Sequence, residues 1–189
     1  ILCPHIRQVV TTMQKFGTIQ QRAEERKGGR AILASLLPTF ITDKQLLAIS
    51  DDRFLSEMSR CLFPAGFVWR VVNQKWDSFE QVFFKFDPNK LVLLSPEQLE
   101  NLAKNPAIIR NMQKIVSVQK NAQMVLDIAH EYGSVSQFIA SWPKDDHIGL
   151  FKKLKQQGDR LGGNTGPRVL RNLGIDTFVL SPDVVMCLQ

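Results

Sequence analysis

The chain has few cysteines and no long apolar run. Its 189 residues include only three cysteines, none of them in a Cys-x-x-Cys pair, which argues against a disulfide framework and favours a reducing compartment. No apolar stretch approaches the roughly 20 residues that a membrane span needs. The opening residues, ILCPHIRQVV, lack the basic leader and apolar segment of a secretory signal. We therefore expect a cytoplasmic protein without membrane contact.

Acidic residues are in the minority. The sequence holds 24 Lys and Arg against 18 Asp and Glu, which gives a net charge of +6 and a pI near 9.4. Such a charge is compatible with nucleic-acid binding, although many solvated surfaces reach it. The hydrophobic content of 44% is sufficient for a core, and the length suits one domain or two small lobes.

Apolar and polar residues do not alternate with a period of two, so we expect an all-α protein. Apolar residues recur at steps of three and four over 108–129. They predict a helix that is capped by Asn105, has Pro106 in its first turn and ends at Gly133. Ser95 followed by Pro96 predicts the start of another helix. Further helices are expected after Thr42 and Asp51, over 77–84, 134–142, 146–157, 167–173 and 182–188, and in the charged stretch that precedes Gly28.

Glycine gathers at one place, between Leu161 and Pro167, where the sequence reads LGGNTGP. Glycine costs conformational entropy, so this cluster predicts a tight turn with exposed backbone N–H groups ahead of a helix. Such a turn binds anions, phosphate above all. Arg168 and Arg171 follow, and no acid lies within 162–175. The alternative is a solvated loop between two helices, where glycine is equally common.

Several short motifs follow one another in order along the chain. Ala65-Gly66-x-x-Trp69 comes first, FDPNKL follows within 79–91, and the series "IIR…KI…NA" begins at Ile108 and ends at Ala122. Together with the glycine-rich turn, these motifs resemble the 3-methyladenine DNA glycosylase I family of the helix–hairpin–helix DNA glycosylase superfamily. The resemblance covers about 51–187 and points to a divergent member.

The resemblance implies an all-α, two-lobed helix–hairpin–helix DNA glycosylase fold. Residues 1–50 would form a helical extension that packs on a glycosylase-like domain of residues 51–189, with its hairpin at 161–167. The implied activity is hydrolysis of the N-glycosidic bond of an alkylated purine in base excision repair, after the nucleotide is flipped out of the duplex. The implied partner is double-stranded DNA with damaged bases, bound by a monomer without a cofactor.

Within this resemblance, Trp69 is the residue that stacks on the base, since an indole face suits a cationic ring. Cys61 and Phe67 are expected to line the same base site. Cys61 falls where the family carries a Glu that hydrogen-bonds the flipped adenine, and a thiol is a weak donor and acceptor. We therefore expect that the pocket recognises another lesion or is inactive. The alternative for Trp69 is that it belongs to the core with Phe63.

The expected DNA contacts lie in the hairpin and the helix after it. The turn would hold phosphate through its backbone N–H groups, and two arginines would support that grip. These residues are Gly162, Gly163, Asn164, Thr165, Gly166, Arg168 and Arg171. A second basic set could follow the DNA backbone or form a solvated face; it comprises Lys104, Arg110, Lys114 and Lys120.

Asp183 is the candidate catalytic residue. The superfamily places its catalytic Asp at the start of the helix after the hairpin unit, where a carboxylate stabilises the developing sugar cation or orients water. One alternative is an ordinary acid in a first turn, favoured by the helix dipole. In another alignment, Asp183 falls at the place of a zinc-ligand His, and Ser181 then takes the place of the catalytic Asp.

No metal site is expected. The family's structural zinc takes Cys and His from both chain ends, and a tetrahedral site needs four convergent ligands. This chain offers only Cys3, His5 and Cys187.

Two rival functions stay open beside the enzyme. One is a non-catalytic helix–hairpin–helix protein that binds damaged DNA, and the other is a helical module that binds proteins.

Overall fold

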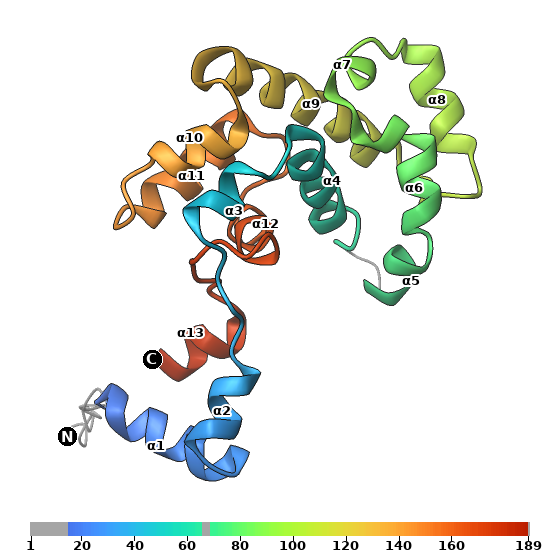
Figure 1. Ribbon diagram of the computed structural model, residues 1–189. Helices are drawn as coiled ribbons and strands as arrows, with labels where there is room; N and C mark the ends of the chain where they lie inside the picture. Colours follow the sequence, from blue (N-terminus) through green and yellow to red (C-terminus); the bar gives the residue numbers. More distant parts are fainter. Residues whose placement is uncertain (1–14, 66–68, 189) are drawn as a thin grey trace, which may run out of the picture. The chain divides into compact units, whose positions relative to one another are not determined.

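The computed structural model describes residues 15–65 and 69–188, which form α-helices joined by short turns and one short 3-10 helix (Figure 1). These residues contain no strand, which confirms the predicted all-α fold class. Within the same ranges, no helix is both long enough and apolar enough to cross a bilayer.

Contacts between Cα atoms divide the chain into two compact units. The larger unit comprises residues 40–179, and the smaller one joins the residues up to 39 with those from 180 onward. The division expected from the family resemblance, into 1–50 and 51–189, stays a prediction.

The smaller unit contains three described helices, which are α1 (Phe16–Lys27), α2 (Arg30–Leu36) and α13 (Pro182–Leu188). Helix α1 ends because Gly28 takes a left-handed conformation with φ of 87°, which glycine adopts without a steric penalty. The charged stretch before Gly28 is therefore a helix followed by a turn, as predicted. Neither α1 nor α2 has a buried residue.

The larger unit is built around one long helix, α9, which packs against α4, α7, α8 and α10. Its elements are α3 (Asp43–Leu47), α4 (Asp51–Leu62), α5 (Trp69–Gln74), α6 (Trp76–Val82), η1 (Phe84–Phe86), α7 (Pro88–Leu91), α8 (Pro96–Lys104), α9 (Met112–Tyr132), α10 (Val135–Ser141), α11 (His147–Gln157) and α12 (Thr165–Asn172).

Capping side chains fix several of these helix starts. Ser95 forms a capping box with Gln98 at the start of α8, and Thr42 does the same with Gln45 for α3. Both starts were predicted from the sequence.

The predicted start of the long helix at Asn105 was wrong, because α9 begins at Met112. The Asn105 side chain accepts the N–H of Ala107 at 2.9 Å and forms a turn rather than a helix cap. Ile108 and Ile109 then enter the core in a non-helical segment. The cap of α9 is Asn111, whose Oδ1 accepts the N–H of Lys114.

An aromatic cluster forms one end of the core. Phe79, Phe83 and Phe86 are fully buried, and Trp76 stacks on Phe86 with their ring centroids 5.4 Å apart. Phe63 meets the edge of Phe79 at 4.6 Å, a favourable geometry for aromatic rings. Phe63 is therefore a core residue, as the alternative stated, and the partly buried Trp69 packs against the same core.

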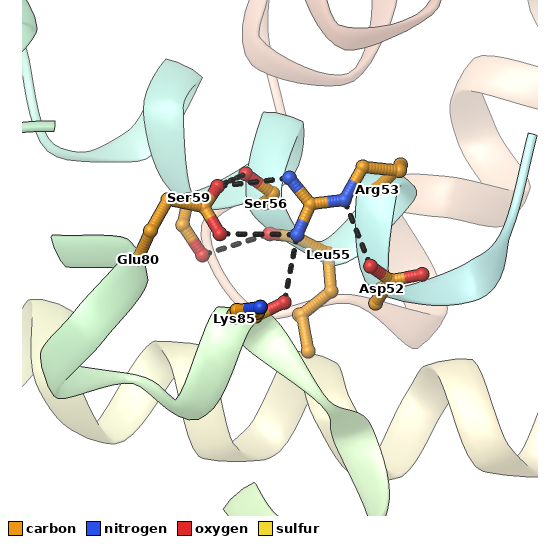
Figure 2. Close-up of polar contacts among 7 residues, drawn as sticks. All are labelled: Asp52, Arg53, Leu55, Ser56, Ser59, Glu80 and Lys85. Atoms are coloured by element: carbon orange, nitrogen blue, oxygen red, sulfur yellow. Dashed lines mark hydrogen bonds and ion pairs between the residues drawn. The ribbon is translucent and has the colours of Figure 1, made fainter. Parts of the chain in front are cut away.

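A charged network ties α4 to α6 and η1 (Figure 2). Arg53 of α4 donates to both carboxylate oxygens of Glu80, each at 3.0 Å, and to the carbonyl of Lys85 at 2.7 Å. Ser56 also donates to Glu80, at 2.7 Å. Lys85 has φ of 57°, a left-handed value that is uncommon for a residue other than glycine. The guanidinium therefore holds a turn whose backbone is costly to form.

Candidate functional site

The glycine-rich segment forms a tight turn between α11 and α12. Gly163 has φ of 60°, and the N–H of Thr165 donates to Gly162 O at 3.2 Å. The N–H of Gly166 donates to Leu161 O at 3.1 Å, and a Cβ atom on Gly166 would lie 2.9 Å from that same oxygen. Glycine is needed at residue 166 because the chain returns so close to itself.

The tip of this turn faces solvent. Gly163 is exposed, whereas Leu161, Gly166 and Pro167 are buried and anchor the turn. The N–H groups of Thr165 and Gly166 donate within the turn itself, so fewer N–H groups face a ligand than the sequence suggested. The exposed tip of the turn is at Gly163.

Helix α12 brings the hairpin to Trp69. The guanidinium carbon of Arg168 lies 5.4 Å from the centroid of the Trp69 ring, a cation–π contact. Trp69 is half-buried, and it starts α5 directly after residues 66–68. Arg171 points elsewhere, since its Nη1 donates to Thr177 O at 2.9 Å. Of the two predicted arginines, Arg168 is therefore the one that lies at the tryptophan.

Cys61 belongs to a small polar cluster between α4 and α12. Its Sγ contacts Glu57 Oε1 at 3.5 Å, and Asn172 Nδ2 donates to the same carboxylate oxygen at 2.7 Å. Asn172 Nδ2 also lies 3.5 Å from the Cys61 sulfur. Burial, reinforced by the Glu57 carboxylate, raises the pKa of the Cys61 thiol, so that it stays neutral at physiological pH.

Glu57 and Asn172 were not among the predicted site residues. A signal for them exists in the spacing, because residues 57 and 61, like 168 and 172, are four apart on their helices. Residues at that spacing share a helix face.

Lys114 supports the segment that leads to Trp69. Its buried ammonium donates to the carbonyls of Phe63 and Ala65 at 2.8 and 2.6 Å. Burial, together with the charge of Arg160, lowers the pKa of Lys114. The interpretation of Lys114 as a DNA-backbone or solvated residue is therefore wrong. In the same basic set, Lys120 pairs with Asp159 at 3.3 Å.

Asp183 lies in the first turn of α13, in the smaller unit, and its side chain is exposed. Ser181 accepts the N–H of Val184 through its Oγ at 3.3 Å and so caps the same turn. Phe67 lies outside the described residues, as do Cys3 and His5. Among the residues that are described, no three His, Cys, Asp or Glu side chains gather as a metal site would require.

A cavity of about 330 Å³ lies between α3, α10 and α11. It is lined by aromatic and charged side chains that include Trp142, Lys144 and His147. None of the described site residues named above lines it, so this cavity is separate from the hairpin and Trp69.

Fold and hairpin together define a helical protein in which a helix–hairpin–helix unit lies beside a half-buried tryptophan. The sequence profile of the Methyladenine glycosylase family matches residues 48–160. The chain therefore belongs to the methyladenine glycosylase family, which confirms the resemblance found in the sequence motifs.

Individual relatives agree with this assignment. The chain is 30% identical over 95 residues to DNA-3-methyladenine glycosylase 1 of Escherichia coli, an alignment that covers 49% of this chain and 50% of that protein. It is 30% identical over 78 residues to DNA-3-methyladenine glycosylase of Haemophilus influenzae, which covers 41% and 42%. The chain thus spans half or less of these curated relatives.

A solved structure shares the fold. The 3-methyladenine DNA glycosylase I of Staphylococcus aureus, described for its recognition of 3-methyladenine, superposes with a TM-score of 0.59. The alignment is 24% identical and covers 70% of this chain and 81% of that one. At this identity the likeness establishes the fold alone.

Proposed function

We propose that the protein is a DNA glycosylase that hydrolyses the N-glycosidic bond of an alkylated purine in duplex DNA, as a step of base excision repair. The observation that carries the proposal is the contact of Arg168, on the helix after the hairpin, with the ring of Trp69. Through this contact, the hairpin that is proposed to bind phosphate lies next to the tryptophan that is proposed to stack on the base. The names of the E. coli and H. influenzae relatives support the same activity.

Binding of the DNA backbone is assigned to the hairpin. The turn of Gly162 and the exposed Gly163, just before α12, is proposed to meet a phosphate through backbone N–H groups, with Asn164 as a neighbouring contact. Thr165 and Gly166 shape the turn through their own hydrogen bonds. Arg168 supplies positive charge one turn further on, and Arg171 supports the chain after α12 by holding Thr177. These contacts are independent of base sequence.

The flipped base is proposed to stack on Trp69, next to Cys61; the sequence assigns Phe67 to the same site. An N3-alkylated adenine carries a positive charge, so the C1′–N bond breaks with its electron pair passing to the base, which leaves as a neutral molecule. No proton donor is needed for this leaving group. Water adds to C1′ of the resulting sugar cation and loses a proton to solvent.

The Asp183 carboxylate is assigned the role of stabilising that sugar cation or orienting the water. The proposal needs no metal or cofactor and treats the protein as a cytoplasmic monomer.

Release of bases from alkylated DNA tests the activity. We expect the full chain to release an alkylpurine from methylated duplex DNA, measured by chromatography of the free bases, and Trp69→Ala to release far less. No release above the Trp69→Ala variant would overturn the enzymatic proposal.

A second function is favoured by one specific observation. The Arg168 guanidinium covers a face of Trp69, and Cys61 cannot replace a carboxylate as an acceptor. Both features suit a non-catalytic protein that binds damaged DNA. Tight, salt-sensitive binding to duplex with an abasic site, without turnover, would favour this alternative. Arg168→Glu should weaken DNA binding under either function, whereas a helical protein-interaction module predicts no DNA binding even at low salt.

A further inference from the structure

The cavity between α3, α10 and α11 is bordered by four parts of the larger unit (Figure 1). Helices α3 and α10, which both contribute to its lining, pack against each other, and the segment after α12 contributes Ile175 and Asp176. The N–H of Ile41 donates to Gly174 O at 2.9 Å and so ties that segment to the chain before α3. At about 330 Å³ the space is large enough for a small ligand. We call it the Trp142 cavity.

The interior of the Trp142 cavity is apolar. Leu46, Ile139 and Leu150 line it, and each is at most 6% exposed. All three belong to the hydrophobic core, so their positions are fixed by packing on other side chains. A ligand with an apolar body gains free energy when it leaves water for such a surface.

Two aromatic side chains, Phe40 and Trp142, add flat surfaces to the lining. Trp142 is held in place, since its Nε1 donates to Asp146 O at 2.9 Å and its ring packs at a T-shaped angle against Phe138. The indole N–H is used within the protein, so Trp142 offers a ligand its aromatic surface and no donor. Such a surface attracts flat rings and cations.

The charged side chains of the lining leave one carboxylate without a partner. Lys144 donates to both carboxylate oxygens of Asp43, at 2.8 and 3.1 Å, so these two charges balance each other. The Asp176 side chain makes no hydrogen bond or ion pair with any residue that the structure describes. Carboxylates are thus in excess at this cavity, although the whole chain carries a net charge of +6. The charge and the aromatic surfaces both favour a cation.

We propose that the Trp142 cavity is a binding site for a small aromatic amine. The ring of the amine occupies the apolar interior beside Trp142, and its protonated amino group pairs with Asp176. A charged donor on a carboxylate forms a stronger hydrogen bond than two neutral groups do. An aromatic acid of the same shape lacks that bond and is repelled by the carboxylate. The site is independent of the proposed glycosylase function, because none of the described residues assigned to DNA or to the base lines it.

Two indoles of opposite charge test the site. Tryptamine carries an ammonium group and indole-3-acetate a carboxylate on the same ring system. We expect tryptamine to bind the full chain with a millimolar dissociation constant, as suits so small a ligand. Indole-3-acetate should bind about 5-fold more weakly, since an exposed charge pair contributes only modestly. The indole N–H signal of Trp142 in a proton–nitrogen correlation spectrum, assigned with Trp142→Phe, reports both titrations.

Three variants locate the binding. Asp176→Asn removes the charge at an exposed position, and we expect it to lose the preference for tryptamine. Asp145→Asn is the matched control, because this carboxylate is also exposed but does not line the cavity, and it should keep the preference. Ala140→Phe places a ring in the cavity and should abolish the binding of both probes. Melting temperatures without ligand show that each variant is folded.

The proposal is overturned if tryptamine leaves the Trp142 signal unmoved, or if indole-3-acetate binds as tightly as tryptamine does. It is also overturned if folded Ala140→Phe still binds tryptamine, because the probe then lies elsewhere. An equal preference in Asp176→Asn and Asp145→Asn would remove Asp176 from the site and contradict the stated recognition of the amine. None of these results depends on base release, so the proposed glycosylase function stands or fails separately.

Discussion

Lys114 stabilises the chain segment that precedes Trp69. Its ammonium spans from α9 to two carbonyls at the end of α4, immediately before the segment that leads to Trp69. A buried acceptor that loses its donor keeps the full cost of desolvation. The basic charge of Lys114 therefore serves packing.

We predict that Lys114→Met lowers the free energy of unfolding by about 1–3 kcal/mol, because the carbonyls of Phe63 and Ala65 lose their donor. Urea denaturation measures the change. Lys120→Met is the matched control, since its exposed ammonium forms only a surface ion pair with Asp159, and it should cost no more than about 1 kcal/mol. Equal effects of the two variants would contradict the supporting role of Lys114.

At the scale of single residues, the sequence motifs led to Trp69 and Cys61 but not to their polar neighbours. Trp69 and Cys61 are recognisable because they occupy fixed places in a family motif. Glu57 lies on α4 and Asn172 on α12, 115 residues further along the chain, with no motif around either. Whether they come into contact depends on how the two helices pack. The spacing within each helix shows only which residues share a face of that helix.

At the scale of secondary structure, the hairpin depends on two glycines for different reasons. Gly166 is needed because a Cβ atom would approach Leu161 O to 2.9 Å, a backbone atom that cannot move aside alone. Gly163 is needed only for its φ of 60°, since nothing lies within 4 Å of a Cβ atom there.

We predict that Gly166→Ala destabilises the protein by about 1–3 kcal/mol, as overpacking does elsewhere, and weakens DNA binding by displacing the start of α12. Gly163→Ala should cost about 1 kcal/mol through left-handed strain and leave the turn in place. Urea denaturation and anisotropy with duplex DNA measure both effects. Loss of DNA affinity in Gly163→Ala alone would contradict this assignment.

The Arg53–Glu80 pair that joins α4 to α6 makes stability depend on pH. Burial alone would raise the pKa of Glu80, but hydrogen bonds from Arg53 and Ser56 outweigh it and hold the pKa below its ordinary value of 4.5. A carboxyl group whose pKa is lower in the folded state stabilises the fold fully above its unfolded pKa. That contribution is lost as the pH falls below 4.5 and through the folded-state pKa.

We therefore predict that the wild type loses stability between neutral pH and pH values below about 4 more steeply than Glu80→Gln does. Melting temperatures measured across that range test the difference. Parallel curves for the two proteins would show that the pair does not contribute to acid unfolding.

The helices themselves were largely predictable, because their starts are set by local chemistry. Ser95 and Thr42 each cap a helix in a capping box with the Gln three residues further on. Asn105 carries the same kind of side chain but caps nothing, since the core takes up Ile108 and Ile109 before the helix begins. Tertiary packing overrode the local signal there.

At the scale of the whole molecule, the proposed roles divide between the two compact units. The hairpin, Trp69 and Cys61 belong to residues 40–179, whereas Asp183 belongs to the smaller unit. The family profile likewise ends at residue 160, before Asp183.

We predict that Asp183→Asn slows single-turnover base release by at least about 100-fold while leaving the affinity for duplex DNA unchanged, because the carboxylate acts on the transition state rather than on binding. Asp176→Asn, which removes another exposed carboxylate, is the control. A rate equal to that of Asp176→Asn would assign the chemistry to the larger unit alone.

The stacking of Arg168 on Trp69 has a consequence for selectivity between normal and damaged bases. Under the proposed function, a base that stacks on the same face of Trp69 has to displace the guanidinium, whose contact with an indole is worth about 0.5–1 kcal/mol at an exposed site and about 2 when desolvated. An uncharged purine recovers less of that attraction than a cationic one does. Arg168 would then compete with the base for Trp69, and undamaged nucleotides would displace it less readily than cationic lesions do.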